Sequence, residues 1–358
     1  MTKAYLVLEN GTVFEGEFFG AKDEVIAEVV FTTGMTGYLE TLTDKSYYGQ
    51  IVVQTFPLIG NYGVIPSDFE GDIIGPRAYI VKEWCQVPSN FRSEANISDF
   101  LESKGIVGLC GIDTRALTKI IREKGVMNGA IVFDPKNANI DDIHAYNVTN
   151  AVNSVTTKEP IVIEGSASNN YHIALIDYGY KKNIARELAK RATKVTVCSA
   201  DITADELKQM NVDGIMLSNG PGDPKENVEI INNLKEIMNL NIPIFGICLG
   251  HQLLALANNF ETSKLKYGHR GANQPVKNLK QNRVYISSQN HGYAVESQTI
   301  NTNIADELFI NVNDKTCEGI EYKNIKAMSV QFHPEACGGP LDTTFLFDEF
   351  IQMIKEDK

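Results

Sequence analysis

A single cysteine, Cys248, stands between two glycines in the stretch IFGICLGHQLLALA, Ile244–Ala257. A strand-like apolar run ends at this cysteine and a helix-like run begins behind it, the arrangement of a nucleophile elbow. Gly246 and Gly250 leave room for a sharp, strained bend, and the N-terminus of the helix favours a thiolate. We therefore predict that Cys248 is a nucleophile; the alternative is a small core cysteine beside tightly packed elements.

A thiolate nucleophile needs an acid–base partner and a group that orients this partner. The stretch QFHPEA offers His333 and Glu335. Side chains two residues apart on extended chain point the same way, so Glu335 can bond one imidazole nitrogen and leave the other for Cys248. Taken alone, H-P-E is an ordinary surface loop, but beside an elbow it predicts a catalytic pair.

Two other histidines compete for the role of base. His251 lies about one helical turn after Cys248 and is expected to pack against the site or cap it, and His291 in SQNHGY is a weaker competitor. Cys337 follows His333 at a spacing that suggests a metal pair, but no second pair matches it. We therefore expect no metal in this chain.

A tetrahedral intermediate needs preorganised hydrogen-bond donors for its oxyanion. The N–H of Leu249, directly after the nucleophile, is one candidate, and the glycine-rich stretch SNGPGDP offers the backbone of Gly220 and Gly222. The alternative for SNGPGDP is an ordinary turn. As a phosphate loop it fails, because it lacks a third glycine and a Walker lysine.

The elements that must position these residues follow from the pattern after Tyr171. Short apolar runs alternate with amphipathic helical runs, which predicts a parallel sheet with helices on both faces. Later segments, RVYISSQNHGYAVES and IKAMSVQFHPEA, read as further strands, so a mixed sheet is expected. SNGPGDP, CLGHQ and FHPEA each follow a strand, where ligands gather in such sheets.

The domain prediction has three parts. Residues 1–150 contain many short β-rich segments and one clear helical pattern, DTRALTKIIREKG, which predicts a β-rich α+β domain. Residues 151–170 are polar and rich in small residues, as in a linker. Residues 171–358 form the predicted α/β domain.

Composition narrows the class of protein. The chain has 358 residues, 43% hydrophobic and 22% charged, with a net charge of −12 and no basic block. This argues against a nucleic-acid or anionic-membrane surface and leaves a protein partner open. Six scattered cysteines without a C-x-x-C pair suggest a reducing compartment, and no signal-peptide core or apolar run of about 18–20 residues stands out. We expect a cytoplasmic protein.

Together, SNGPGDP, GICLGHQ and FHPE resemble the triad-type (Cys-His-Glu) glutamine amidotransferases, which implies a flavodoxin-like fold for the second domain. The resemblance extends over the whole chain to the small subunits of glutamine-hydrolysing carbamoyl phosphate synthetase. The stretches that carry it are MTGYLETLTDKSYYGQIV, PLIGNYG, CGIDTRALTKIIREKG, GHRGANQPV and SQNHGYAV. CGIDTRALT and the N-terminal domain distinguish the chain from the amidotransferases of anthranilate or GMP synthesis.

The resemblance implies the triad Cys248, His333 and Glu335, with Leu249 and Gly220 as the oxyanion donors. It implies glutamine contacts at Ser46, Gly220, Gly222, Leu249, Gln252, Asn290, Gly292 and Tyr293. It also implies that ammonia passes to a large subunit that makes carbamoyl phosphate from bicarbonate for arginine or pyrimidine biosynthesis, or both. ATP and Mg are expected on that partner and no cofactor in this chain. The stretch ACGGPLD departs from the family, which more often has a serine-proline stretch and a histidine near Leu341.

Two alternatives remain open. A stand-alone amidase or γ-glutamyl hydrolase would use the same elbow without a partner and would give residues 1–150 no role. A catalytically silent scaffold would dock a synthetase and regulate it. The presence of Cys248, His333 and Glu335 together argues against the scaffold.

Overall fold

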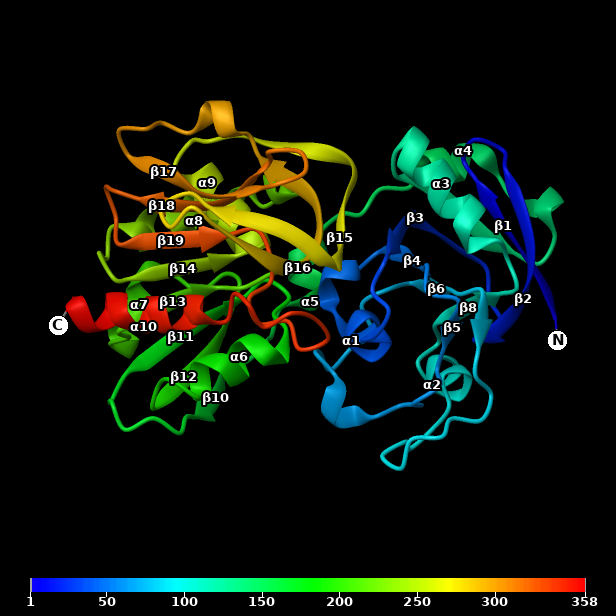
Figure 1. Ribbon diagram of the computed structural model, residues 1–358, viewed down its shortest axis with the longest axis horizontal. Helices are drawn as coiled ribbons and strands as arrows, with labels where there is room; N and C mark the ends of the chain where they lie inside the picture. Colours follow the sequence, from blue (N-terminus) through cyan, green and yellow to red (C-terminus); the bar gives the residue numbers. More distant parts are fainter. Residues whose placement is uncertain (1, 358) are drawn as a thin grey trace. The chain divides into compact units, whose positions relative to one another are not determined.

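The computed structural model describes residues 2–357, and its contacts divide the chain into two compact units, with the boundary between Thr149 and Asn150. Figure 1 shows the path of the chain and the labels of its elements. Each unit has its own hydrophobic core. Within the described residues, no helix combines the length and the apolar character needed to cross a membrane.

The first unit is built around a closed sheet of strands in the order β1-β2-β8-β6-β4-β3-β9 (Figure 1). Alternate residues of these strands, such as Leu6, Val29 and Leu109, point into the closed sheet and are fully buried there. The strands are β1 (Lys3–Leu8), β2 (Val13–Gly20), β3 (Val25–Thr32), β4 (Gln50–Gln54), β6 (Ala78–Ile80), β8 (Val107–Cys110) and β9 (Met127–Val132).

Helices and a small ribbon surround this sheet. Helix α3 (Thr114–Lys124) is the helix that the sequence predicts: the Asp113 side chain accepts a hydrogen bond from the N–H of Ala116, and Gly125 ends the helix at φ 108°. The remaining elements are α1 (Tyr38–Thr43), α2 (Ile97–Ser103), α4 (Ile140–Ala145), β5 (Leu58–Ile59), β7 (Glu83–Trp84) and the 3₁₀ turns η1 (Lys45–Tyr47), η2 (Pro66–Asp68) and η3 (Pro135–Asn137).

The second unit is a mixed sheet in the order β10-β12-β11-β13-β14-β19-β18-β17-β15-β16 (Figure 1). Strands β12, β11, β13, β14 and β19 run parallel, and the pairs from β19 through β18, β17 and β15 to β16 are antiparallel. The bounds are β10 (Ile161–Glu164), β11 (His172–Asp177), β12 (Lys194–Ser199), β13 (Gly214–Leu217), β14 (Ile244–Ile247), β15 (Thr262–Asn278), β16 (Arg283–Val295), β17 (Ala305–Asn311), β18 (Cys317–Tyr322) and β19 (Ala327–Val330).

Helices cover both faces of this sheet. On one face, α7 (Ala204–Met210), α8 (Val228–Met238) and α9 (Leu249–Ala257) share a core with strand residues such as Ala174 and Ile176. On the other face, α6 (Lys182–Ala189) and α10 (Phe345–Glu356) pack on the alternate residues Ile173 and Leu175. The 3₁₀ turns η4 (Pro224–Glu226) and η5 (Ser297–Thr299) lie in loops. The predicted fold class, α/β with a mixed sheet plus a β-rich first domain, is confirmed.

The structure differs from the prediction for residues 151–170. They contain helix α5 (Ala151–Val155) and strand β10, which pairs with β12 at the edge of the sheet. Val152 is buried in the core of the second unit, whereas most side chains of β10 are exposed. Residues 161–163, Ile-Val-Ile, are β-branched as in a strand, but the polar and small residues on both sides dominate the composition, and the segment therefore looked like a linker.

Candidate active site

The backbone bends sharply at Cys248, between the end of β14 and the start of α9. Cys248 has φ 53° and ψ −102°, a left-handed conformation that side chains other than glycine rarely adopt. Its N–H donates to the carbonyl of Val330 on the neighbouring strand β19 at 2.8 Å. The predicted elbow is present, and the parallel strand beside it fixes the position of the cysteine.

Steric contacts explain the two flanking glycines. A Cβ atom at Gly250 would lie 2.4 Å from the carbonyl oxygen of Leu217 and 2.7 Å from its Cβ. A Cβ atom at Gly246 would lie 3.0 Å from the carbonyl carbon and oxygen of Gly250. Helix α9 therefore starts so close to β13 and β14 that a side chain at Gly250 has no space.

His333 and Glu335 lie together in the loop after β19. The Nδ1 atom of His333 is 2.7 Å from Oε1 of Glu335. Both side chains are buried: that of His333 is 1% exposed and that of Glu335 is 0% exposed. The N–H of His333 donates to the carbonyl of Ser288 on β16 at 2.9 Å, and Sγ of Cys248 lies 3.8 Å from the carbonyl of Asn290 on the same strand. Among residues 2–357, no hydrogen-bond partner lies at the buried Nε2 atom of His333, which leaves this nitrogen for the predicted contact with Cys248.

The charges of the pair favour an imidazolium beside a carboxylate. Burial and the charge of Lys181 lower the pKa of His333, but Glu335 and the nearby sulfur of Cys248 outweigh both and raise it to about 9. Burial raises the pKa of Glu335, but the charges of His333 and Lys181 outweigh burial and lower it to about 2. His333 therefore holds a proton near neutral pH, which stabilises a thiolate beside it.

Lys181 is a site residue that the sequence analysis missed. Its Nζ lies 3.3 Å from Nδ1 of His333 and 3.5 Å from Oε1 of Glu335, and its side chain is only 12% exposed. The Oδ1 atom of Asn219 accepts a hydrogen bond from the N–H of Lys181 at 3.1 Å, which ties this loop to SNGPGDP. The signal was its position after β11, because a polar stretch follows this strand just as one follows β13, β14 and β19.

The two predicted oxyanion donors are neighbours. A Cβ atom at Gly220 would lie 2.7 Å from Cδ2 of Leu249 and 2.2 Å from the carbonyl of Tyr178, so glycine allows this close approach. The N–H of Gly250 donates to the carbonyl of Ser218 at 3.0 Å. Leu249 is the first residue of α9, where a backbone N–H has no partner within the helix, and its role as an oxyanion donor stays a prediction.

Several predicted glutamine contacts gather around β16. The Nε2 atom of Gln252 donates to the carbonyl of Tyr293 and to Oε1 of Gln331, both at 2.8 Å. Gln331, which holds the side chain of Gln252, is a second residue that the sequence analysis missed. Asn290 and Gly292 lie on the same strand, β16, and Gly222 has φ 89° in the SNGPGDP loop. Ser46 belongs to the first unit, in η1, and its glutamine contact stays a prediction.

The two competing histidines, His251 and His291, make hydrogen bonds to residues outside the predicted triad. Nδ1 of His251 lies 2.8 Å from Oγ of Ser329, and burial lowers the pKa of this imidazole to about 3. Nδ1 of His291 lies 2.7 Å from the carbonyl of Tyr293. His251 is therefore neutral and packed inside the protein, away from the role of base.

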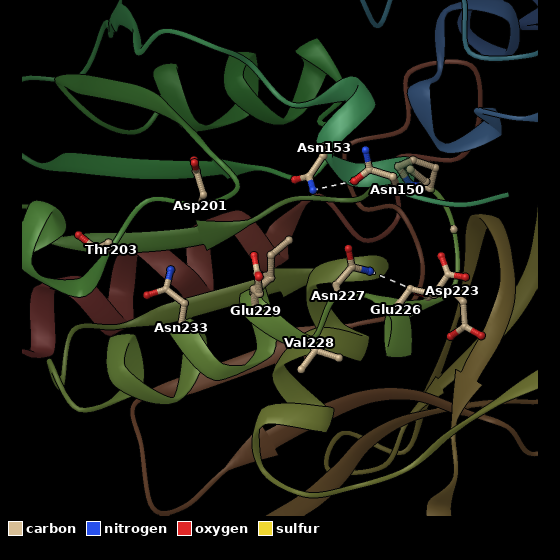
Figure 2. Close-up of a pocket in the computed structure, with 14 residues that line it drawn as sticks. Asn150, Asn153, Asp201, Thr203, Asp223, Glu226, Asn227, Val228, Glu229 and Asn233 are labelled. Carbon is tan, nitrogen blue, oxygen red and sulfur yellow. Dashed lines mark hydrogen bonds between the residues drawn. The ribbon is translucent and has the colours of Figure 1, made fainter.

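A separate cavity of about 620 Å³ lies on the second unit (Figure 2). Asp201, Asp223, Glu226 and Glu229 contribute four carboxyl groups to its lining. The lining includes Gly222 of the SNGPGDP loop but no member of the predicted triad. The cavity therefore does not hold the triad, although it borders the predicted glutamine contact Gly222.

Comparisons with known proteins agree with this geometry. Residues 174–353 match the family described as glutamine amidotransferase class-I, and residues 6–131 match the CPSase domain of the carbamoyl-phosphate synthase small chain. The fold and the elbow of the second unit thus define a class-I glutamine amidotransferase domain.

Similar proteins cover almost the whole chain. The chain is 51% identical to the carbamoyl phosphate synthase small chain of Clostridium perfringens (strain 13 / Type A), over 98% of this chain and 99% of that protein. It is 48% identical to the protein of the same name from Caldanaerobacter subterraneus subsp. tengcongensis, over 98% and 96%. The small chain of Listeria monocytogenes serotype 4b is 47% identical over 99% and 97%. The chain belongs to the carbamoyl phosphate synthase small-chain family, which confirms the resemblance.

Proposed function

We propose that this chain hydrolyses L-glutamine to glutamate and ammonia and delivers the ammonia to a large ATP-dependent subunit that makes carbamoyl phosphate from bicarbonate. Family membership supports the proposal. The observation that carries it is the left-handed backbone of Cys248 at a helix N-terminus, next to a buried imidazole that a carboxylate orients.

The reaction proceeds through a thioester. The Cys248 thiolate attacks the side-chain amide carbon of glutamine, and the N–H groups of Leu249 and Gly220 bind the oxyanion. His333 gives its proton to the departing nitrogen, the carbon–nitrogen bond breaks, and ammonia leaves a γ-glutamyl thioester on the sulfur. His333 then takes a proton from water, which attacks the thioester and releases glutamate and the thiolate.

The raised pKa of His333 suits this sequence of steps. At neutral pH the imidazolium is present at the start, so the acid for the first step is already charged and held by Glu335. Lys181 limits how far the pKa rises, which keeps the proton transferable. The lysine therefore adjusts the acid and takes no part in forming bonds.

Ammonia is mostly protonated near neutral pH and loses its nucleophilicity in bulk water, which favours direct transfer to the partner. ATP and Mg²⁺ belong on the large subunit in this proposal, and this chain needs no cofactor for the hydrolysis itself. The product serves arginine or pyrimidine biosynthesis, or both, and the expected location is the cytoplasm.

The test is Cys248→Ala in the complex reconstituted with the large subunit. Carbamoyl phosphate synthesis from glutamine should be abolished, whereas synthesis from added ammonia should continue at the wild-type rate. Loss of both activities would overturn the proposed division of labour. Full glutamine hydrolysis by the wild-type chain alone, unaffected by the partner, would favour a stand-alone amidase.

A further inference from the structure

Two buried ligand-type side chains and one partly buried one come together on the antiparallel strands of the second unit. His269 of β15, His291 of β16 and Glu318 of β18 each offer a nitrogen or oxygen atom, and these atoms all lie within 4.8 Å of one another. His269 and His291 are direct partners across the antiparallel pair β15–β16, with ring centroids 4.9 Å apart. The cluster lies entirely within the second unit and outside the triad.

Each member of the cluster is held from its outer side. Nε2 of His269 lies 2.8 Å from a carboxylate oxygen of Asp314, and Nδ1 of His291 lies 2.7 Å from the carbonyl of Tyr293. The side-chain amide of Asn311 donates to Oε1 of Glu318 at 3.1 Å. Outer carboxylates and carbonyls of this kind fix the orientation and tautomer of metal-binding imidazoles.

The inner side of the cluster holds two acceptors, Oε2 of Glu318 and Nε2 of His291, next to Nδ1 of His269. Nδ1 of His269 and Oε2 of Glu318 are buried and make no hydrogen bond within the described residues. The carbonyl of Tyr293 at Nδ1 of His291 places the proton on that nitrogen and a lone pair on Nε2. Oε1 of Gln289, 3.3 Å from Nε2, is also an acceptor, so it supplies no donor to this lone pair. Buried acceptors without a partner are costly, and a cation would satisfy Oε2 of Glu318 and Nε2 of His291. At His269 the cation would replace the proton that Nδ1 holds toward Oε1 of Glu318, 3.3 Å away.

The spacing also suits a metal ion. Nδ1 of His269 lies 3.3 Å from Oε1 of Glu318, the oxygen that also accepts from Asn311. The three ligand atoms lie within 4.8 Å of one another, so a small inward shift of the third ligand completes the site. Two ligands of a tetrahedral zinc ion, with bonds of about 2.0–2.1 Å, are about 3.3 Å apart. Imidazole nitrogens favour zinc and its neighbours in the first transition series over Mg²⁺ and Ca²⁺, which take oxygen ligands.

We propose that His269, His291 and Glu318 bind one divalent transition-metal ion, best matched by Zn²⁺, with water as the fourth ligand. The ion is structural and joins β15, β16 and β18. The carbonyl of Tyr293 accepts from both His291 and Gln252, so the ion also steadies the wall that carries the predicted glutamine contacts. This differs from the expectation of no metal, which rested on Cys337 and His333 alone.

The test is zinc binding by the full-length chain after chelator treatment, measured by equilibrium dialysis. Wild type and Cys248→Ser should each bind one equivalent of Zn²⁺, because the serine variant removes the competing thiolate of the elbow. Glu318→Gln, which keeps the side-chain shape, should weaken binding by roughly 100-fold or more. His144→Gln, at a histidine that is 57% exposed, is the matched control and should bind as wild type does.

Cobalt provides an independent readout. Co²⁺ in Cys248→Ser should show the visible bands of a tetrahedral site without a thiolate charge-transfer band. Equal zinc affinity of wild type and Glu318→Gln, or loss of zinc in Cys248→Ser, would overturn the proposal. If Glu318→Gln does not fold, Asp314→Asn decides: it should weaken binding roughly 10- to 100-fold, and unchanged affinity would overturn the site.

Discussion

The parallel and antiparallel halves of the second unit build sites in different ways. In the parallel half, β11, β13, β14 and β19 end at one edge, and the loops after them carry Lys181, Gly220, Cys248 and His333. In the antiparallel half, His269, His291 and Glu318 meet across the face of β15, β16 and β18. Strand ends bring together whole sequence motifs, whereas strand faces bring together single residues whose neighbours in sequence point elsewhere.

The largest expected effect is a loss of kcat when His333, at the edge of the parallel half, is replaced, compared with replacement of the buried His251. His333→Asn should lower kcat for glutamine hydrolysis in the reconstituted complex by roughly 10²- to 10⁴-fold, because the acid for the departing nitrogen is lost. His251→Asn is the matched control: it removes the bond to Ser329 from a neutral, buried imidazole, so stability should fall and kcat should change far less. Equal losses of kcat in the two variants would contradict the assigned roles.

Gly250→Ala tests the packing of the elbow. The added Cβ would lie 2.4 Å from the carbonyl of Leu217, and the free energy of unfolding should fall by about 3 kcal/mol as α9 moves away from β13. Ala255→Gly, at a buried position in the same helix, should cost about 1 kcal/mol through helix propensity. Urea unfolding followed by circular dichroism measures both. A smaller cost for Gly250→Ala than for Ala255→Gly would show that the bend tolerates a side chain.

Two charge changes around His333 should act in opposite directions on the pH profile of kcat/KM. Burial and Lys181 lower the pKa of His333, but Glu335 and the sulfur of Cys248 outweigh both and raise it to about 9. The activity that depends on the imidazolium is therefore lost as the pH rises through this value. Glu335→Gln should move the alkaline limb to lower pH by about one unit or more. Lys181→Met should move it to higher pH, because Lys181 lowers the same pKa. Shifts in the same direction would contradict this electrostatic account.

The smallest expected effect compares two buried cysteines. Cys317 on β18 is fully buried like Cys248, but its sulfur lies 3.7 Å from the carbonyl of Gly319, and burial raises its pKa well above the ordinary value. Cys317→Ala should cost about 1 kcal/mol of stability and leave kcat unchanged. Thermal unfolding and steady-state glutamine hydrolysis measure the two quantities. A large fall in kcat would mean that the antiparallel half takes part in the chemistry.

Much of the parallel half could be predicted because its signals are local. Glycines at both sides of Cys248, a proline-linked His333 and Glu335, and apolar strands before both motifs indicate an elbow and its partners within short stretches. Lys181 escaped notice because its stretch, YKKNIARELAKRA, reads as the polar start of an amphipathic helix. Its ammonium reaches His333 only because β11 and β19 end at the same edge.

The strand pairing in the antiparallel half, and the pairing of the edge strand β10, could not be predicted from short stretches of sequence. Strand β15 pairs with β16 through two register shifts, between Lys264 and His269 and between Gly271 and Gln274, so the partner of His269 does not follow from alternation. Strand β10 carries three β-branched residues, Ile-Val-Ile, but its side chains are mostly exposed and its antiparallel pairing with β12 depends on a partner about 30 residues away.

The sequence by itself determined the bend at Cys248, because glycine spacing and the change from strand to helix are properties of contiguous residues. It also determined the alternation of strands and helices that places polar stretches at strand ends. Only the tertiary structure decided which charges surround His333 and which side chains meet His269. Pairing between strands far apart along the chain sets those distances, and both pKa values and metal coordination depend on separations of a few ångströms.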